Sequence, residues 1–121
     1  MAKYVLIVDD EPNIVLSLEF LMKKEAYEVL SVSNGDEAMQ AIAEKIPDLI
    51  LLDVMMPRKD GYEVCQELRS NPSWKDIKII MLTAKGRVVE REKGLALGAD
   101  DYVTKPFATQ ELVEKVKALL N

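Results

Sequence analysis

The chain has 121 residues, of which 49% are hydrophobic and 31% are charged, and its net charge is −5. This length and composition fit a single globular domain over residues 1–121. The acidic balance argues against direct nucleic-acid binding, which requires a basic face. One cysteine and no histidine exclude an internal disulfide and a histidine-based catalytic dyad. No apolar run approaches the ~20 residues of a membrane span, and the first residues do not resemble a signal peptide. We therefore expect a soluble, cytoplasmic protein that makes no contact with a membrane.

The first half of the chain predicts three strands and two helices. The strands are expected at residues 4–8, 29–32 and 49–52. The first and third are continuous apolar runs, typical of strands buried on both faces of a parallel sheet, whereas the second is more polar. Apolar side chains at helical spacing predict a helix from Ile14 to Met22. A second helix carries Ala38 to Ala43, with Asp36 as its expected cap.

The second half continues the alternation with two strands and three helices. Strands are expected at 77–82 and 102–104, and helices at about 62–70, at about 88–97 and from Thr109 onward. The 88–97 helix is the weakest, because Gly94 lies inside it and its apolar positions are poorly spaced. Gly98 is placed to cap the C-terminal end of this helix.

The strand-helix units follow one another without a linker or a change in composition. Alternating buried strands and helices indicate a parallel sheet with helices on both faces, and right-handed crossovers restrict its topology. The expected fold is therefore a three-layer α/β structure, flavodoxin-like and doubly wound, in which five β-α units form a sheet of strand order 2-1-3-4-5.

Polar side chains gather where four of the predicted strands end. Asp9 and Asp10 follow the first strand, Asp53 the third, Thr83 the fourth and Lys105 the fifth. Because all strands of a parallel sheet end at one edge, and ligands bind in the crevice outside that edge, these groups should converge on one site.

Each of these residues has an ordinary alternative explanation. A single Asp after a strand is often a helix cap or a loop residue, and Asp9, Asp10 and Glu11 together are also what the positive end of a helix dipole favours. The joint pattern at one edge is different, because clustered carboxylates repel one another unless a cation joins them. Hard oxygen ligands suit Mg²⁺, or Mn²⁺ in its place. We expect weak metal affinity that is linked to a bound phosphate.

The segments VLIVDDEP, LILLDVMMPRKDGYE, IIMLTAK and GADDYVTKPF resemble those of the response regulator receiver family of two-component signalling systems. The resemblance extends from residue 3 to the last helix. It implies a phosphoacceptor that takes a phosphoryl group from the phosphohistidine of a sensor histidine kinase or a phosphotransfer protein. It also implies a downstream effector protein or output domain, and it leaves open a phosphorylation-dependent homodimer.

The resemblance also implies a role for each matched residue. Asp53 would be the phosphoacceptor and a metal ligand, together with Asp10, with the backbone carbonyl of Met55 and, through water, with Asp9. The remaining roles are phosphate contacts from Lys105 and Thr83, a switch formed by Thr83 and Tyr102, a cis peptide bond between Lys105 and Pro106, and tuning of the acyl phosphate lifetime by Met55 and Lys85.

We therefore expect a signalling phosphoacceptor that catalyses only its own phosphorylation and slow dephosphorylation. Its output face would comprise the helix at 88–97, the strand at 102–104 and the last helix. One alternative is an interaction module of the same fold that works without phosphorylation. A dehalogenase-type phosphatase would carry a D-x-D motif after the first strand, and a flavin-binding module would carry small hydroxyl residues and glycine there; this chain has Asp9-Asp10-Glu11 instead.

Overall fold

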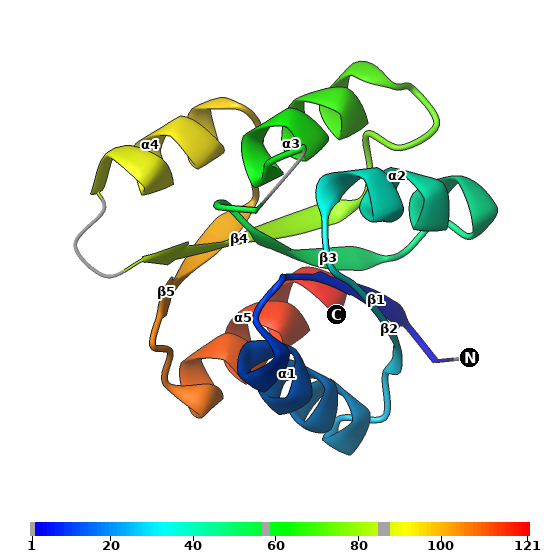
Figure 1. Ribbon diagram of the computed structural model, residues 1–121. Coiled ribbons are helices and arrows are strands. Elements are labelled where there is room, and N and C mark those ends of the chain that lie inside the picture. Colours follow the sequence, from blue (N-terminus) through cyan, green and yellow to red (C-terminus); the bar gives the residue numbers. More distant parts are fainter. Residues whose placement is uncertain (1, 57–58, 85–87) are drawn as a thin grey trace.

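The computed structural model describes residues 2–56, 59–84 and 88–121. Within them, strands and helices alternate along the chain (Figure 1). The strands are β1 (Tyr4–Val8), β2 (Glu28–Val32), β3 (Leu49–Asp53), β4 (Lys78–Ala84) and β5 (Asp101–Lys105). The helices are α1 (Pro12–Lys24), α2 (Gly35–Glu44), α3 (Gly61–Ser70), α4 (Val88–Ala96) and α5 (Thr109–Leu120).

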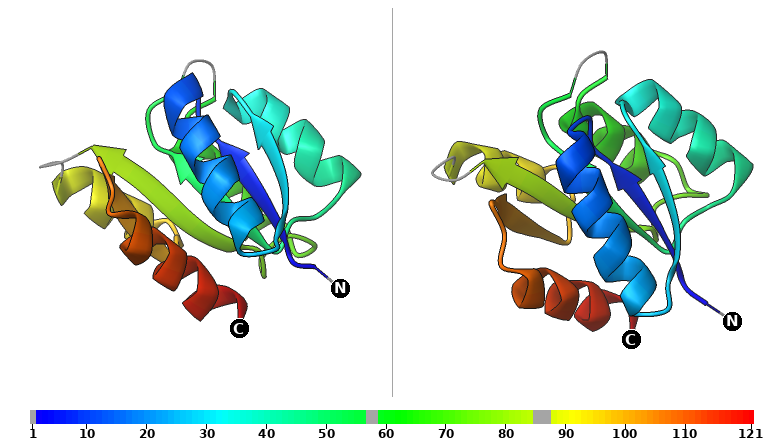
Figure 2. Two further views of the ribbon diagram at one scale, coloured as in Figure 1. Left: turned by 90° about the horizontal axis from the view of Figure 1, so that it is seen from below. Right: turned by 60° about the horizontal axis from the view of Figure 1, so that its bottom comes forward.

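All strands lie in one parallel sheet of order β2-β1-β3-β4-β5, which confirms the predicted topology. Helices α2, α3 and α4 cover one face of the sheet, and α1 and α5 cover the other (Figure 1). Figure 2 shows α1 and α5 as neighbours on their face, where Lys117 Nζ lies 3.1 Å from Glu25 Oε1. None of the helices in the described residues is long and apolar enough to cross a membrane.

Alternation along the strands divides the interior into two apolar cores. In β3, Leu49 and Leu51 point into the core under α1 and α5, whereas Ile50 and Leu52 point into the core under α2, α3 and α4. All four side chains are fully buried. This is why the central strands are continuous apolar runs, while β2, at the edge of the sheet, has no fully buried residue.

The predicted element types are correct, but several boundaries and one cap are not. The structure extends β3 to Asp53, β4 to Ala84 and β5 to Lys105, so residues expected just beyond strands lie inside them. The cap of α2 is Asn34, whose side chain accepts a hydrogen bond from the backbone N–H of Glu37 at 2.9 Å. Asp36 instead lies in the first turn, where its charge interacts favourably with the helix dipole.

Helix α4 packs closely on the sheet because of Gly94. A Cβ atom at this position would lie 3.1 Å from Cγ of the buried Met81 on β4. Gly94 lowers the helix propensity of this segment, but its lack of a side chain permits the close contact of α4 with β4. Gly98 ends this segment with a φ of +111°, as expected for a glycine after a helix.

Candidate functional site

Three polar side chains at the ends of β1, β3 and β5 converge at one edge of the sheet. Asp53 and Lys105 are the final residues of β3 and β5, and Asp9 directly follows β1. Side chains alternate along strands, so Asp53 continues the side of Leu51, and Lys105 continues the side of Val103. Both residues therefore lie on the α1/α5 face, as the convergence of parallel strand ends predicts.

The carboxylates of Asp9, Asp10 and Asp53 form a compact cluster. One oxygen atom from each lies within 4.8 Å of the others. Asp9 and Asp53 are buried, whereas Asp10 is exposed, so the cluster opens to solvent on one side. Carboxylates at this spacing repel one another, and this repulsion favours the binding of a cation.

Lys105 is the ammonium group that faces this cluster. Its Nζ lies 3.1 Å from Asp9 Oδ2, 3.4 Å from Asp53 Oδ1 and 3.0 Å from Glu11 Oε1. The first two contacts agree with the predicted convergence. Glu11 is an addition that the sequence analysis missed, because an acidic residue at the start of a helix is adequately explained by the helix dipole.

Burial and charge act in opposite directions on Asp53. Burial raises the pKa of this carboxyl to about 7, and the Asp9 carboxylate adds to the increase. Lys105 and the backbone N–H of Met55, which donates to Asp53 Oδ1 at 3.3 Å, lower it. Burial alone would lower the pKa of Lys105, but Asp53, Glu11 and Asp9 outweigh it and raise that pKa. Lys105 therefore stays charged at neutral pH.

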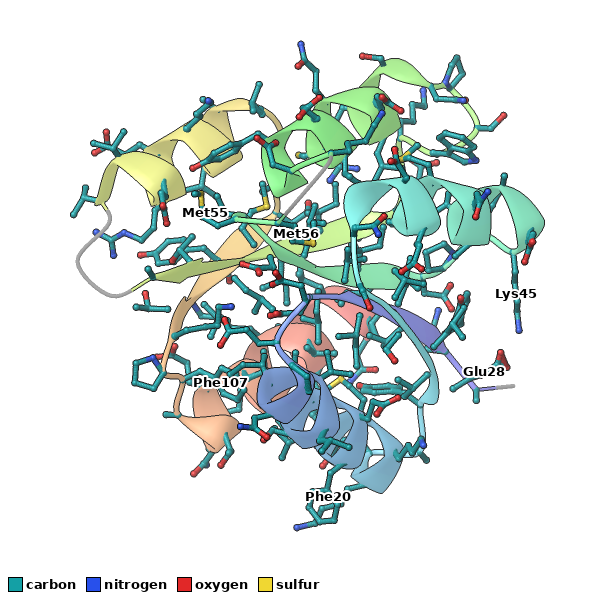
Figure 3. The ribbon with its side chains drawn as sticks, viewed as in Figure 1. Phe20, Glu28, Lys45, Met55, Met56 and Phe107 are labelled. Carbon is teal, nitrogen blue, oxygen red and sulfur yellow. The ribbon has the colours of Figure 1, made fainter. Side chains whose placement is uncertain are left out.

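A small cavity of about 200 Å³ opens beside Asp53. Its lining comes from β3 and the loop after it, from β4, from the end of β5, from the residue before α1, and from α4. Among the described residues, the lining consists of Glu11, Asp53, Val54, Met55, Leu82, Ala84, Glu90 and Lys105. In Figure 3, Met55 lies at this end of the sheet, whereas Lys45 and Glu28 mark the opposite end. Glu90 is a third buried acid at the site, after Asp9 and Asp53, and the sequence analysis did not single it out.

The backbone around Asp53 is held by a glycine and a helix cap. A Cβ atom at Gly61 would lie 2.3 Å from the carbonyl oxygen of Asp53, so α3 can begin here only with glycine. Asp60 caps α3 and forms a capping box with Glu63. At the other side of the site, the peptide bond between Lys105 and Pro106 is cis.

Comparison with known proteins identifies the family to which this site belongs. The family model for the response regulator receiver domain matches residues 5–117. This chain belongs to that family.

Solved receivers from several bacteria share the fold. A structure named for a response regulator from Chloroflexus aurantiacus J-10-fl is 40% identical, with a TM-score of 0.96 over 99% of this chain and 98% of that one. The signal receiver domain of a histidine kinase from Syntrophus aciditrophicus is 37% identical, with a TM-score of 0.91 over 98% and 90% of the two chains. NtrX from Brucella abortus is 26% identical, with a TM-score of 0.92 over 99% of this chain but 27% of its own.

In this receiver, Thr83 lies apart from the carboxylates. It continues the Met81 side of β4, which faces α4, so its side chain lies on the opposite face of the sheet from Asp53. Its hydroxyl is buried and has no hydrogen-bond partner among the residues that the structure describes. A buried hydroxyl without a partner has a free energy cost, which a new acceptor near this end of β4 would remove.

Tyr102 of the receiver is half-buried and lies between two cations. Its hydroxyl accepts a hydrogen bond from Arg91 Nη1 at 3.2 Å, and the Arg91 guanidinium lies 4.9 Å from the ring centroid. Lys115 Nζ lies 4.8 Å from the same centroid and donates to the Tyr102 carbonyl at 2.7 Å. Tyr102 thereby connects β5 with both α4 and α5.

The metal predicted for this receiver fits the residues that are present. The cluster offers carboxylate oxygens, the ligands that Mg²⁺ and Mn²⁺ prefer, and the exposed Asp10 leaves one side open to the waters that Mg²⁺ retains. Met55 lies next to the cluster through its hydrogen bond to Asp53. Lys85, predicted to tune the acyl phosphate lifetime, lies outside the described residues.

Proposed function

We propose that this receiver accepts a phosphoryl group on Asp53 from the phosphohistidine of a sensor histidine kinase or a phosphotransfer protein. The observation that carries the proposal is the position of the Asp53 carboxylate, which is buried between two further carboxylates and 3.4 Å from the Lys105 ammonium. The Lys105 ammonium places a positive charge beside this nucleophile, and phosphoryl transfer requires positive charge around the transferred group.

In the proposed reaction, an oxygen of ionised Asp53 forms a bond to phosphorus as the bond between phosphorus and the donor imidazole breaks. The imidazole leaves with the electron pair and takes up a proton from solvent. Lys105 favours the ionised nucleophile, and its ammonium faces the charge on the transferred group. The product is a mixed anhydride that carries about one more negative charge than the carboxylate.

Asp10, Asp53 and the Met55 carbonyl would hold Mg²⁺ or Mn²⁺ directly, and Asp9 would do so through water. The metal would supply positive charge to the phosphoryl oxygens, which repel the approaching carboxylate. Water attack on the anhydride would then set its lifetime, and we propose that Met55 and Lys85 tune it. We propose that the chain catalyses only its own phosphorylation and slow dephosphorylation.

The output is proposed to pass through Thr83 and Tyr102. The hydroxyl of Thr83, which has no hydrogen-bond partner within the described parts of the chain, would turn toward the phosphoryl group. This movement would change the space next to Tyr102 on the α4 face. Helix α4, β5 and α5 would then present a different surface to an effector protein, to an output domain or to a second copy of the chain. The Brucella abortus protein supports the arrangement with further domains, because this chain spans 27% of it. The cytoplasm is the proposed compartment.

Intact mass after incubation with Mg²⁺ and acetyl phosphate tests the proposal, with Asp53→Asn as the comparison. We expect the parent to gain one phosphoryl group and the variant to gain none. If neither gains mass although Mg²⁺ binds the parent, the chain is an interaction module that works without phosphorylation. A gain in both proteins would place the acceptor elsewhere.

A further inference from the structure

The cavity beside Asp53 contains two carboxylates that the proposed function does not use. Glu11 is the residue that precedes α1, and Glu90 lies in the first turn of α4, so they reach the cavity from opposite faces of the sheet. Each is in contact with a hydrogen-bond donor that lines the same cavity.

Glu11 forms an ion pair with the ammonium group of Lys105. Its Oε1 lies 3.0 Å from Lys105 Nζ, closer than the 3.4 Å that separates this ammonium from Asp53 Oδ1. Glu11 makes no side-chain cap of α1, although it stands at the capping position. The side chain is therefore placed for its contact with Lys105 and not for the helix.

Glu90 occupies a backbone donor at the end of β4. Its Oε1 accepts from the N–H of Ala84 at 3.4 Å, and Ala84 directly follows Thr83. The Glu90 side chain is buried, although a carboxylate in the first turn of a surface helix ordinarily points to water. Tyr62 on α3 donates to the backbone carbonyl of Glu90 at 3.3 Å, which fixes this turn of α4 above the cavity.

We infer that Glu11 and Glu90 are resident carboxylates that occupy, in the resting receiver, the donors a phosphoryl group on Asp53 would require, and that phosphorylation displaces both. This inference rests on the proposed function. A phosphoryl group brings three acceptor oxygens and about one additional negative charge into the cavity. The single N–H of Ala84 can serve these oxygens only if Glu90 releases it, and Glu11 competes with them for the ammonium of Lys105. The added charge also repels both glutamates inside a cavity of about 200 Å³.

The two displacements have different consequences. Glu11 is mostly exposed, so its release returns a carboxylate to water and affects only how tightly the site holds an anion. Glu90 belongs to α4, so its release frees the first turn of that helix from the end of β4. Val88 and Val89 in this turn are exposed. Glu90 thus makes the position of α4 depend on whether the phosphoryl group is present.

Beryllium fluoride, which binds a carboxylate as a phosphoryl stand-in, gives the direct test. Its affinity at saturating Mg²⁺ would be measured by ¹⁹F NMR titration for the parent, for Glu11→Gln and for Glu90→Gln. We expect each substitution to tighten binding about five- to tenfold, because each releases one donor from a charge-assisted hydrogen bond. The control is Glu44→Gln at the far end of α2, which removes the same charge and should change the affinity less than twofold. Thermal melts establish that the variants are folded.

Glu11→Asp and Glu90→Asp separate occupation of the donors from simple charge repulsion. Each keeps its charge but is one methylene shorter and does not reach its donor, so we expect affinities within about twofold of the matching Gln variant. Aspartate variants that behave like the parent would overturn the inference, as would Gln variants with unchanged affinity. If the parent is phosphorylated by acetyl phosphate while these affinities do not change, the inference fails and the proposed function stands. If the parent is not phosphorylated, the proposed function itself fails.

Discussion

At the scale of single residues, the surroundings of Asp53 disfavour the ionised form of its carboxyl group. It is buried beside Asp9, and among the described residues Lys105 and the backbone N–H of Met55 favour its ionised form. Burial of the Asp53 charge beside Asp9 therefore opposes folding of the metal-free protein. The same repulsion favours the binding of a cation to the cluster.

Stability of the metal-free protein should therefore depend on pH through Asp53. Its pKa rises from 3.8 to about 7 on folding, so the folded protein binds the proton more tightly than the unfolded chain does. The free energy of unfolding should accordingly decrease as pH rises from about 4 to about 7 and then level off. Asp53→Asn removes this dependence, and at pH 8 it should be more stable than the parent by on the order of 1–2 kcal/mol after solvent screening.

Urea unfolding at pH 4, 6 and 8 in the presence of a chelator measures this difference. Glu44→Gln, which removes a charge outside the site, should follow the parent at each pH. Saturating Mg²⁺ should reverse the order of parent and Asp53→Asn at pH 8, because the cation binds the ionised form. A difference between them that stays constant from pH 4 to pH 8 would contradict the assignment to Asp53.

At the scale of the elements, the end of α1 contains a local strain. Ala26 follows this helix with a φ of 67°, in the left-handed region that glycine adopts at little cost. The N–H of Ala26 donates to the carbonyl of Lys23 at 2.9 Å, and the N–H of Tyr27 donates to that of Met22 at 3.1 Å. The turn into β2 is therefore well formed, but with an unfavourable residue at its centre.

Ala26→Gly should stabilise the receiver by about 0.5–1 kcal/mol, because relief of the left-handed strain exceeds the extra entropy of an unfolded glycine. The measurement is urea unfolding beside Ala43→Gly, an exposed position inside α2 where the same exchange should destabilise by about 1 kcal/mol. Equal destabilisation by both changes would show that residue 26 is not strained.

The elements also show what the sequence could predict. The buried strands are recognisable because both of their faces meet a core, which requires apolar residues at every position. Their ends are not, because Asp53, Thr83 and Lys105 are polar and resemble loop residues although the backbone pairing continues through them. The sequence therefore predicts strands that end too early wherever their last residues are polar site residues.

The site was predictable to the extent that strand order determines it. Asp9, Asp53 and Lys105 converge because parallel strands end together, and this needs no knowledge of packing. Glu11 and Glu90 reach the site from helices, and their position depends on how each helix packs on the sheet. For α4 that packing depends on the contact of Gly94 with Met81, which no local pattern reveals.

At the scale of the whole molecule, Arg69 joins segments from three parts of the chain. Its Nε donates to the Gly98 carbonyl at 2.8 Å, and Nη1 donates to the carbonyls of Lys75 and Ile77 at 2.8 and 2.7 Å. Its Nη2 lies 2.9 Å from Asp100 Oδ2, which also accepts from the N–H of Ile79. The guanidinium thus connects α3 with the start of β4 and with the loop between α4 and β5.

Arg69→Lys should destabilise the protein by about 2–3 kcal/mol, because one ammonium cannot replace a planar group that serves three carbonyls and a carboxylate. Asp100→Asn, which keeps an acceptor oxygen for the N–H of Ile79, should cost less. Thermal and urea unfolding give both values. A loss below about 0.5 kcal/mol for Arg69→Lys would show that water substitutes for these contacts.

The anchorage at Gly98 has a mechanical consequence for α4. Gly98, just beyond one end of this helix, is bound by Arg69, while the first turn of the helix meets the cavity beside Asp53 through Glu90. A rod held at one end responds to a push at the other by tilting about the fixed point. Nine residues span about 13 Å, so a tilt of roughly 10° carries Val88 about 2 Å while Leu97 hardly moves. The helix would therefore act as a lever with its pivot at Gly98. A small change in charge at Asp53 would produce its largest displacement at the first turn of α4, which is farthest from the pivot.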